Sequence, residues 1–135
     1  MTEGNAEIRS RIMRAVKGTD TGPEMLVRRI TFGMGYRYRL HRADLPGKPD
    51  MVFVQRRKVI FVNGCFWHGH SCPRGARQPK QNAEYWLKKI TSNRDRDKAN
   101  FFALKKLGWK VLVVWECWLK KPDGIKHRIA NFLES

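Results

Sequence analysis

Two short apolar runs separated by a polar tripeptide restrict most strongly what this chain can fold into. The runs are "DMVFV" at residues 50–54 and "KVIFV" at residues 58–62, and "QRR" lies between them. Apolar runs of this length joined by a polar turn are typical of buried β-strands. We therefore predict a pair of buried strands here, with Asp50 opening the first.

The remaining patterns predict helices on the faces of this sheet. "YRYRL" alternates like an edge strand, and "WKVLVVWE" indicates a central strand. One helix is expected between the cap candidates Asp20 and Thr21 and the terminating Gly33 and Gly35. Other helices are expected at residues 5–17, 83–107 and 123–133. The predicted fold is α/β or α+β, with a central mixed sheet flanked by helices.

The charge balance points to a polyanionic partner. The chain of 135 residues carries 28 Lys and Arg against 12 Asp and Glu, a net charge of +16. Nucleic acid suits such a field, although a solvated basic surface or ribosomal packing is the alternative. We expect a DNA-contacting segment at residues 1–20, with Arg14 and Lys17 on the phosphates, and one domain at 21–135. No signal peptide or membrane-spanning run is present, so a cytoplasmic protein is expected.

A cysteine and histidine cluster predicts a structural zinc site. Cys65, His70 and Cys72 follow the spacing C-x4-H-x-C, and Cys117 ends "VLVVWEC". Three thiolates and one imidazole complete a tetrahedral zinc shell, which leaves no open position for water. The alternative is that Cys65 and Cys117 are small core residues and that His70 lies on the surface.

Three acidic residues are candidates for catalysis. "PD" at Asp50 is typical of nucleases whose carboxylate holds magnesium, but it is also a common junction between a loop and a strand. Asp97 falls on the predicted inner stripe of the long helix, with Arg94, and either pairs with Arg94 or orients a functional histidine. Glu24 is either a second active-site acid or a favourable charge at a helix N-terminus.

The segment between the cysteines adds a histidine and two aromatic residues. His68 is either a general base for attacking water, a metal ligand in place of His70, or an exposed residue. Phe66 and Trp67 in this loop, and Trp86 beyond it, could wedge between base pairs. Ordinary core packing is the alternative, and it is favoured for Trp109 and Trp115.

Together these residues resemble the very-short-patch-repair (Vsr) DNA mismatch endonucleases. The likeness rests on "RSRIMRAVKGTDTGPEMLVRR", "LPGKPD", "VIFVNGCFWHGHSC", "EYWLKKI", "NRDRD" and "LGWKVLVVWEC". The resemblance implies a restriction-endonuclease-like core, a structural zinc ion, and a magnesium-dependent nick on the 5′ side of the thymine in a T·G mismatch. It implies a monomer acting on double-stranded DNA, with contact to mismatch-repair proteins.

The resemblance also implies roles for individual residues. Asp50 and the backbone carbonyl of Val62 would hold magnesium. His68 would be the general base and Asp97 its orienting carboxylate, and Glu24 would be an acid near the active site. The zinc ligands would be Cys65, His70, Cys72 and Cys117, and the intercalating aromatics Phe66, Trp67 and Trp86.

One departure affects the expected chemistry. Asn63 stands where the family carries a second active-site histidine, and an amide donates a hydrogen bond but cannot shuttle a proton. A homing-type or other site-specific endonuclease on the same core, cutting matched DNA, is therefore the main rival. A zinc-bearing protein that binds nucleic acid without cutting it is the third hypothesis.

Overall fold

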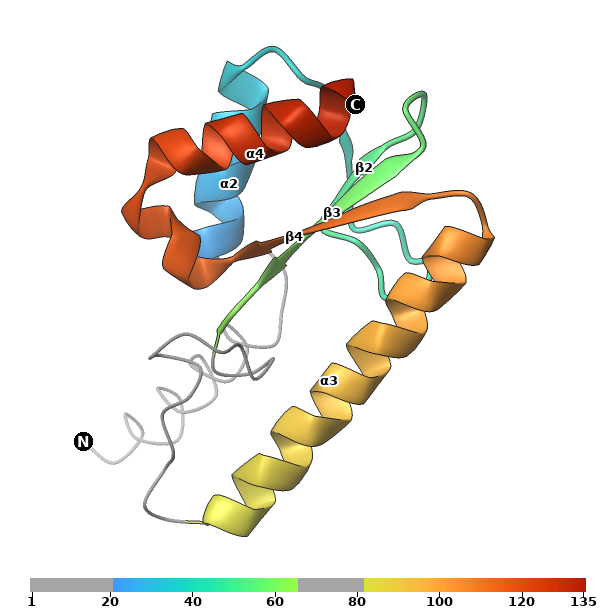
Figure 1. Cartoon of the computed structure of the whole chain (residues 1–135), viewed down its shortest axis with the longest axis vertical. Helices are drawn as coiled ribbons and strands as arrows, with labels where there is room; N and C mark the ends of the chain where they lie inside the picture. The colour runs from blue at the N-terminus through green and yellow to red at the C-terminus, as the bar shows by residue number, and fades with distance from the viewer. Residues whose placement is uncertain (1–20, 66–81) are drawn as a thin grey trace, which may run out of the picture.

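The computed structural model describes residues 21–65 and 82–135. The predicted helix at residues 5–17 lies outside these ranges. In chain order the elements are α2 (Gly22–Gly33), β1 (Arg39–Leu40), β2 (Met51–Phe53), β3 (Lys58–Asn63), α3 (Ala83–Lys106), β4 (Lys110–Trp115), the 3-10 helix η1 (Glu116–Lys120) and α4 (Pro122–Glu134). The fold is α/β, with a four-stranded mixed sheet (Figure 1), and it is compatible with a restriction-endonuclease-like core.

The strands lie in the order β1-β2-β3-β4. β1 pairs antiparallel with β2, and β2 with β3. β3 and β4 are parallel, with Val62 opposite Val114. Parallel neighbours need a long crossover connection, which here contains α3. The "QRR" turn between β2 and β3 confirms the predicted hairpin.

Two buried clusters cover the two faces of the sheet. One cluster joins α2 and α4 to the strands, and it includes Val27, Met51, Ile60 and Ile129. On the other face, Leu104 near the end of α3 packs with residues such as Val59, Phe61 and Trp109. Figure 1 shows α2 and α4 together on one side of the sheet and α3 on the other. The alternation along β3 sends neighbouring side chains to opposite layers.

A buried lysine closes the α4 layer. Lys58 is 4% exposed, and its Nζ donates to the backbone oxygens of Phe132 at 2.7 Å, Leu133 at 3.1 Å and Ser135 at 2.8 Å. The last carbonyls of a helix lack intrahelical partners and carry partial negative charge. Lys58 therefore fixes the end of α4 to the start of β3.

Two sequence predictions about the sheet are wrong in detail. β4 was expected at the centre, but it lies at one edge of the described sheet. Its apolar run reflects helices covering its faces and carries no information about how many strands flank it. The "YRYRL" edge strand is shorter than expected, since only Arg39–Leu40 pair with β2.

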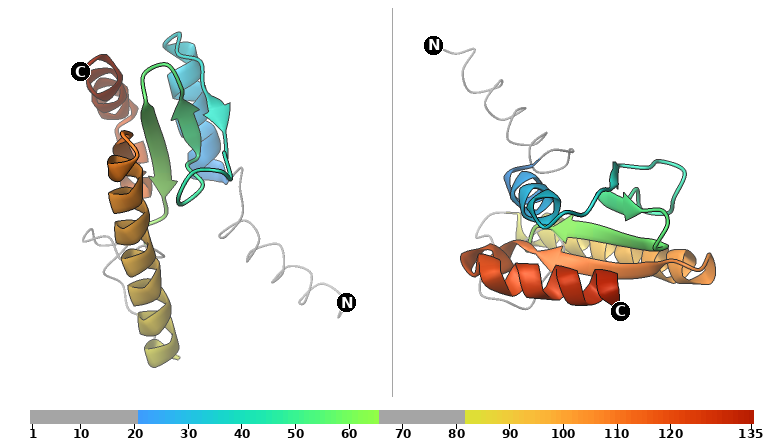
Figure 2. Two further views of the ribbon diagram at one scale, coloured as in Figure 1. Left: turned by 90° about the vertical axis from the view of Figure 1, so that its right-hand side faces the viewer. Right: turned by 90° about the horizontal axis from the view of Figure 1, so that it is seen from above.

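The predicted inner stripe of α3 is confirmed in most of its members, which are Trp86 or Leu87, Ile90, Arg94, Asp97, Phe101 and Leu104. Leu104 is buried, and Trp86, Ile90 and Phe101 are half-buried, whereas Leu87 is 63% exposed. Arg94 is exposed, not core-facing as predicted, and Asp97 is half-buried. Figures 1 and 2 show the N-terminal half of α3 extending beyond the described strands. Among the described residues, no strand lies beneath this half of the helix.

Candidate active site and metal centre

Glu24, His41 and Asp50 meet beside the ends of α2, β1 and β2. Each offers one ligand atom, and these atoms all lie within 4.8 Å of one another. His41 Nε2 lies 2.6 Å from Glu24 Oε2 and 3.9 Å from Asp50 Oδ1. This trio is the one group in residues 21–65 and 82–135 whose His, Cys, Asp and Glu side chains could hold a metal ion.

The first turn of α2 positions Glu24. The Thr21 side chain caps the helix by accepting a hydrogen bond from the Glu24 N–H at 3.3 Å, as expected for a threonine N-cap. The Glu24 residue is only 2% exposed, and Arg28 Nη1 lies 3.4 Å from its Oε2 oxygen. Burying a carboxylate is costly unless it is paired, and here an arginine and a histidine surround it.

A hydrogen bond from β3 holds the Asp50 carboxylate in position. Its Oδ2 oxygen accepts a hydrogen bond of 2.7 Å from the Val62 N–H. Burial raises the pKa of Asp50 to about 7, and Glu24 adds to the rise, while the Val62 N–H and His41 oppose it. Two carboxyl groups that share a partly buried space favour a bound cation or a proton.

His41 was missed by sequence reasoning. It follows the edge strand β1 with a left-handed backbone, φ +46°, which costs free energy in a residue other than glycine. Its N–H points to the Asp50 carbonyl oxygen at 3.5 Å. Glu24, His41 and Asp50 come from three separate elements, so no sequence spacing reveals the cluster. The only signal was a histidine placed just beyond an exposed strand.

Asn63 ends β3 as a buried polar residue. It is 5% exposed, and its Nδ2 atom has no hydrogen-bond partner within the described residues. Buried donors are almost always satisfied. Asn63 therefore offers an unused N–H donor at the same end of β3 as Val62.

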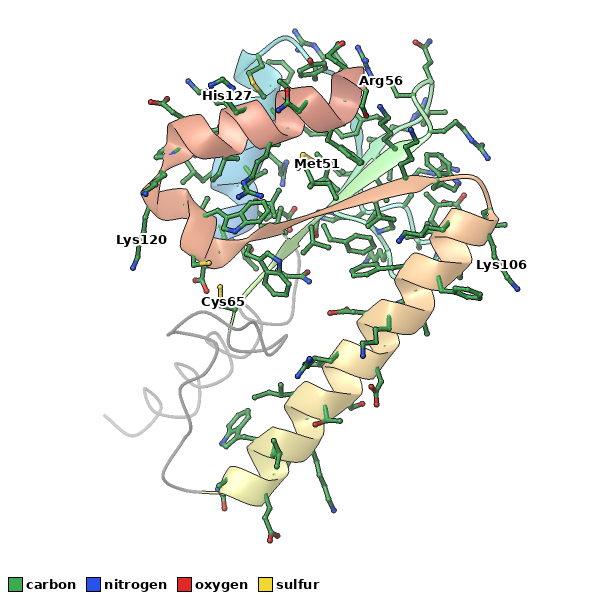
Figure 3. The ribbon with its side chains drawn as sticks, viewed as in Figure 1. Met51, Arg56, Cys65, Lys106, Lys120 and His127 are labelled. Atoms are coloured by element: carbon green, nitrogen blue, oxygen red, sulfur yellow. The ribbon has the colours of Figure 1, made fainter. Side chains whose placement is uncertain are left out.

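Two of the predicted zinc ligands lie together. Cys65, fully buried, follows β3, and Cys117 lies in η1 after the parallel strand β4. The Cys117 N–H donates to Cys65 Sγ at 3.3 Å. Figure 3 shows Cys65 at the end of β3 near η1. The other two predicted ligands, His70 and Cys72, lie outside the described residues.

Comparison with known proteins identifies the relatives of this chain. Residues 4–74 match the family model described as DNA mismatch endonuclease Vsr. The DNA mismatch endonuclease Vsr of Escherichia coli is 44% identical over 117 residues, which cover 87% of this chain and 74% of that protein. The chain belongs to the Vsr family of DNA mismatch endonucleases.

Other Vsr relatives are named as nicking enzymes. The type II nicking enzyme V.XorIIP of Xanthomonas oryzae pv. oryzae is 48% identical over 128 residues, covering 95% of this chain and 93% of the relative. V.NmeAIP of Neisseria meningitidis, also a type II nicking enzyme, is 46% identical over 125 residues, covering 93% and 89%. The resemblance seen in the sequence motifs is confirmed, and the chain is an endonuclease.

Of the other predicted site residues, the structure describes some and not others. Trp86 is half-buried on α3, with its ring 5.1 Å from that of Tyr85. His68, Phe66 and Trp67 lie outside the described residues, as do Arg14 and Lys17. None of the helices in the described ranges is long and apolar enough to cross a membrane.

Proposed function

We propose that this protein is a magnesium-dependent endonuclease that nicks DNA on the 5′ side of the thymine in a T·G mismatch. The observation that carries the proposal is the cluster of Glu24, His41 and Asp50 in a chain of the Vsr family. The excess of positive charge suits a DNA substrate. The protein would act as a monomer in the bacterial cytoplasm and contact mismatch-repair proteins.

The donor atoms beside Asp50 fit a magnesium ion. Magnesium prefers oxygen ligands such as carboxylates and carbonyls. The N–H and carbonyl of one strand residue point to the same edge of the strand, so the Val62 N–H bond to Asp50 supports a Val62 carbonyl directed to the same place. Asp50 and the Val62 carbonyl would hold the ion. When bound there, magnesium would stabilise negative charge developing on the phosphate.

Protein side chains would perform the proton chemistry. His68 would accept the proton of the attacking water, and Asp97 would orient the His68 ring by accepting its other N–H. Glu24 would support the site through its contacts with His41 and Arg28. The unused Asn63 N–H could donate to a phosphate oxygen, which is the role left to an amide that cannot shuttle a proton.

A zinc site would brace the loop that meets DNA. Cys65, His70, Cys72 and Cys117 would form a closed shell, and the contact between Cys65 and Cys117 supports it. The braced loop would present Phe66 and Trp67 to the base stack, together with Trp86 from α3. Arg14 and Lys17 would hold the phosphate backbone, and the aromatic side chains would unstack the mismatched step.

A second candidate function is site-specific nicking, since the names of two relatives specify nicking and mention no mismatch. V.XorIIP and V.NmeAIP are called type II nicking enzymes. A site-specific nickase that cuts matched DNA would use the same residues and would differ only in how the substrate is chosen.

Substrate choice separates the two functions. A T·G duplex and its fully paired counterpart are incubated with excess protein and magnesium, in a set of flanking sequences. Mismatch endonuclease activity predicts a single nick beside the thymine in the T·G duplex and little cutting of the paired duplex. Equal nicking of both duplexes at one sequence would reject mismatch specificity in favour of site-specific nicking.

A further inference from the structure

His41 brings a nitrogen atom into a site otherwise built from oxygen. Its Nε2 shares a hydrogen bond of 2.6 Å with Glu24 Oε2 and lies 3.9 Å from Asp50 Oδ1, so a metal ion bound at Nε2 would take the place of the proton in that bond, which would be released to solvent. Asp50 Oδ2 is already occupied by the Val62 N–H. The second carboxylate oxygen, Oδ1, is thus the one that shares the space with His41.

The spacing of these atoms suits one shared ion. Two ligands on opposite sides of a divalent ion lie about 4–4.5 Å apart, and the three ligand atoms here lie within 4.8 Å of one another. Shifts of a few tenths of an ångström would place all three around a common centre. The side chains are 16% exposed for His41 and 20% for Asp50, so an ion can reach them from solvent.

The backbone at His41 holds the imidazole in this place. Its conformation is left-handed, with φ +46°, a region that histidine adopts more readily than most residues other than glycine. An ordinary extended continuation of β1 would direct the side chain elsewhere.

We propose that Glu24, His41 and Asp50 bind one divalent ion with His41 Nε2 as a nitrogen ligand, so that the centre prefers Mn²⁺ to Mg²⁺. The proposal rests on the proposed function, because it concerns the same metal centre. Imidazole is a good ligand for transition metals, whereas Mg²⁺ favours oxygen. Mg²⁺ can still bind through the carboxylates and the Val62 carbonyl, but more weakly than Mn²⁺.

The test uses Mn²⁺ as a spectroscopic probe of the full-length protein without DNA. At about pH 8 an ordinary imidazole is neutral and can coordinate. Electron spin echo spectroscopy of the Mn²⁺-loaded wild type should show coupling to a directly bound imidazole nitrogen. Absence of nitrogen coupling in the wild type would overturn the proposal, whatever the behaviour of the variants.

Two variants assign the signal. His41→Gln keeps a hydrogen-bond donor toward Glu24 but removes the imidazole, and it should abolish the nitrogen coupling. The ratio of Mg²⁺ to Mn²⁺ dissociation constants should fall about tenfold in this variant. His127→Gln is the matched control, because His127 is exposed on α4 (Figure 3) and does not belong to the trio, and it should change neither quantity.

The outcomes distinguish this proposal from the proposed function. Nitrogen coupling that survives His41→Gln would come from another histidine and would contradict the assignment. A T·G-specific nickase that lacks nitrogen coupling would retain the proposed function and lose only the His41 ligand. Conversely, a protein with the coupling but without T·G nicking would keep the metal site and reject the substrate.

Discussion

The Oδ2 oxygen of Asp50 accepts a hydrogen bond of 2.7 Å from the backbone N–H of Val62. Asp50 lies just before β2, and Val62 lies near the end of β3. The bond therefore joins the two strands beyond their last residue pair, Met51 and Ile60. It leaves the Oδ1 oxygen facing His41. The carboxylate is therefore held in place by the backbone, as the proposed metal site would require.

Removing the negative charge of Asp50 should stabilise the protein in buffer without magnesium or manganese. The pKa of Asp50 is raised from 3.8 to about 7, so the folded protein holds this proton more tightly than the unfolded chain. The negative charge that Asp50 gains as the pH rises from 4 toward 7 therefore lowers the stability of the folded protein. Asp50→Asn should raise the free energy of unfolding by roughly 1–3 kcal/mol at about pH 8.

Denaturant unfolding across the pH range checks this expectation. The gain should shrink toward pH 4, where Asp50 is protonated in the wild type as well. The Asn side chain retains an oxygen that can accept the Val62 N–H. A gain that is equal at both ends of the range would show that the charge of Asp50 is not its cause.

Lys58 should be more important for stability than its neighbouring surface lysines. Lys58→Met keeps the aliphatic stem but removes the ammonium group that binds the α4 carbonyls of Phe132 and Leu133. Hydrogen bonds from charged groups contribute about 1.5–3 kcal/mol, and we expect a loss of about 2 kcal/mol. Lys110→Met, at an exposed position on β4, is the control and should change stability by less than about 0.5 kcal/mol.

Gly47 should resist replacement because it packs the loop before Asp50 against α3. Its φ is +76°, and a Cβ atom there would lie 3.0 Å from the Asn100 side chain. Gly47→Ala should lower the free energy of unfolding by about 1–2 kcal/mol and weaken metal binding at Asp50. Gly22→Ala is the matched control, since a Cβ at Gly22 meets nothing within 4 Å, and thermal unfolding compares the two.

Zinc should co-purify with the protein in a one-to-one ratio. Cys117→Ser removes a predicted ligand whose N–H contacts Cys65, and it should lower both the zinc content and the melting temperature. Elemental analysis with thermal unfolding measures the two effects. A wild-type protein that stays fully stable after a chelator has removed its zinc would rule out the structural role.

The sequence predicted those features that depend on local pattern. The apolar runs located β2 and β3, and the turn between them followed from "QRR". The edge position of β4 could not be predicted. Its apolar residues pack against helices, and this packing does not depend on how many strands flank β4. Similarly, the helical period of α3 extends through Arg94, which is exposed because no described strand lies beneath it.

The candidate site is limited in the same way, because only part of it has a local signal in the sequence. Asp50 has a local signal in "PD", and Glu24 lies in a recognisable first turn. His41 has no such signal. Its own left-handed backbone and the packing of α2 against the sheet bring it close to Asp50 and Glu24. The unpaired Asn63 donor likewise depends on burial, which only the folded chain reveals.

The most direct test of the account is single-turnover nicking of a T·G duplex by Asp50→Asn. The variant keeps the size of the side chain and loses the charge that would hold magnesium, so nicking should fall by at least about 100-fold while affinity for the duplex is retained. DNA binding is measured by fluorescence anisotropy on the same duplex. Nicking by Asp50→Asn at the wild-type rate, with equal DNA binding, would contradict the central claim that Asp50 forms the reaction centre.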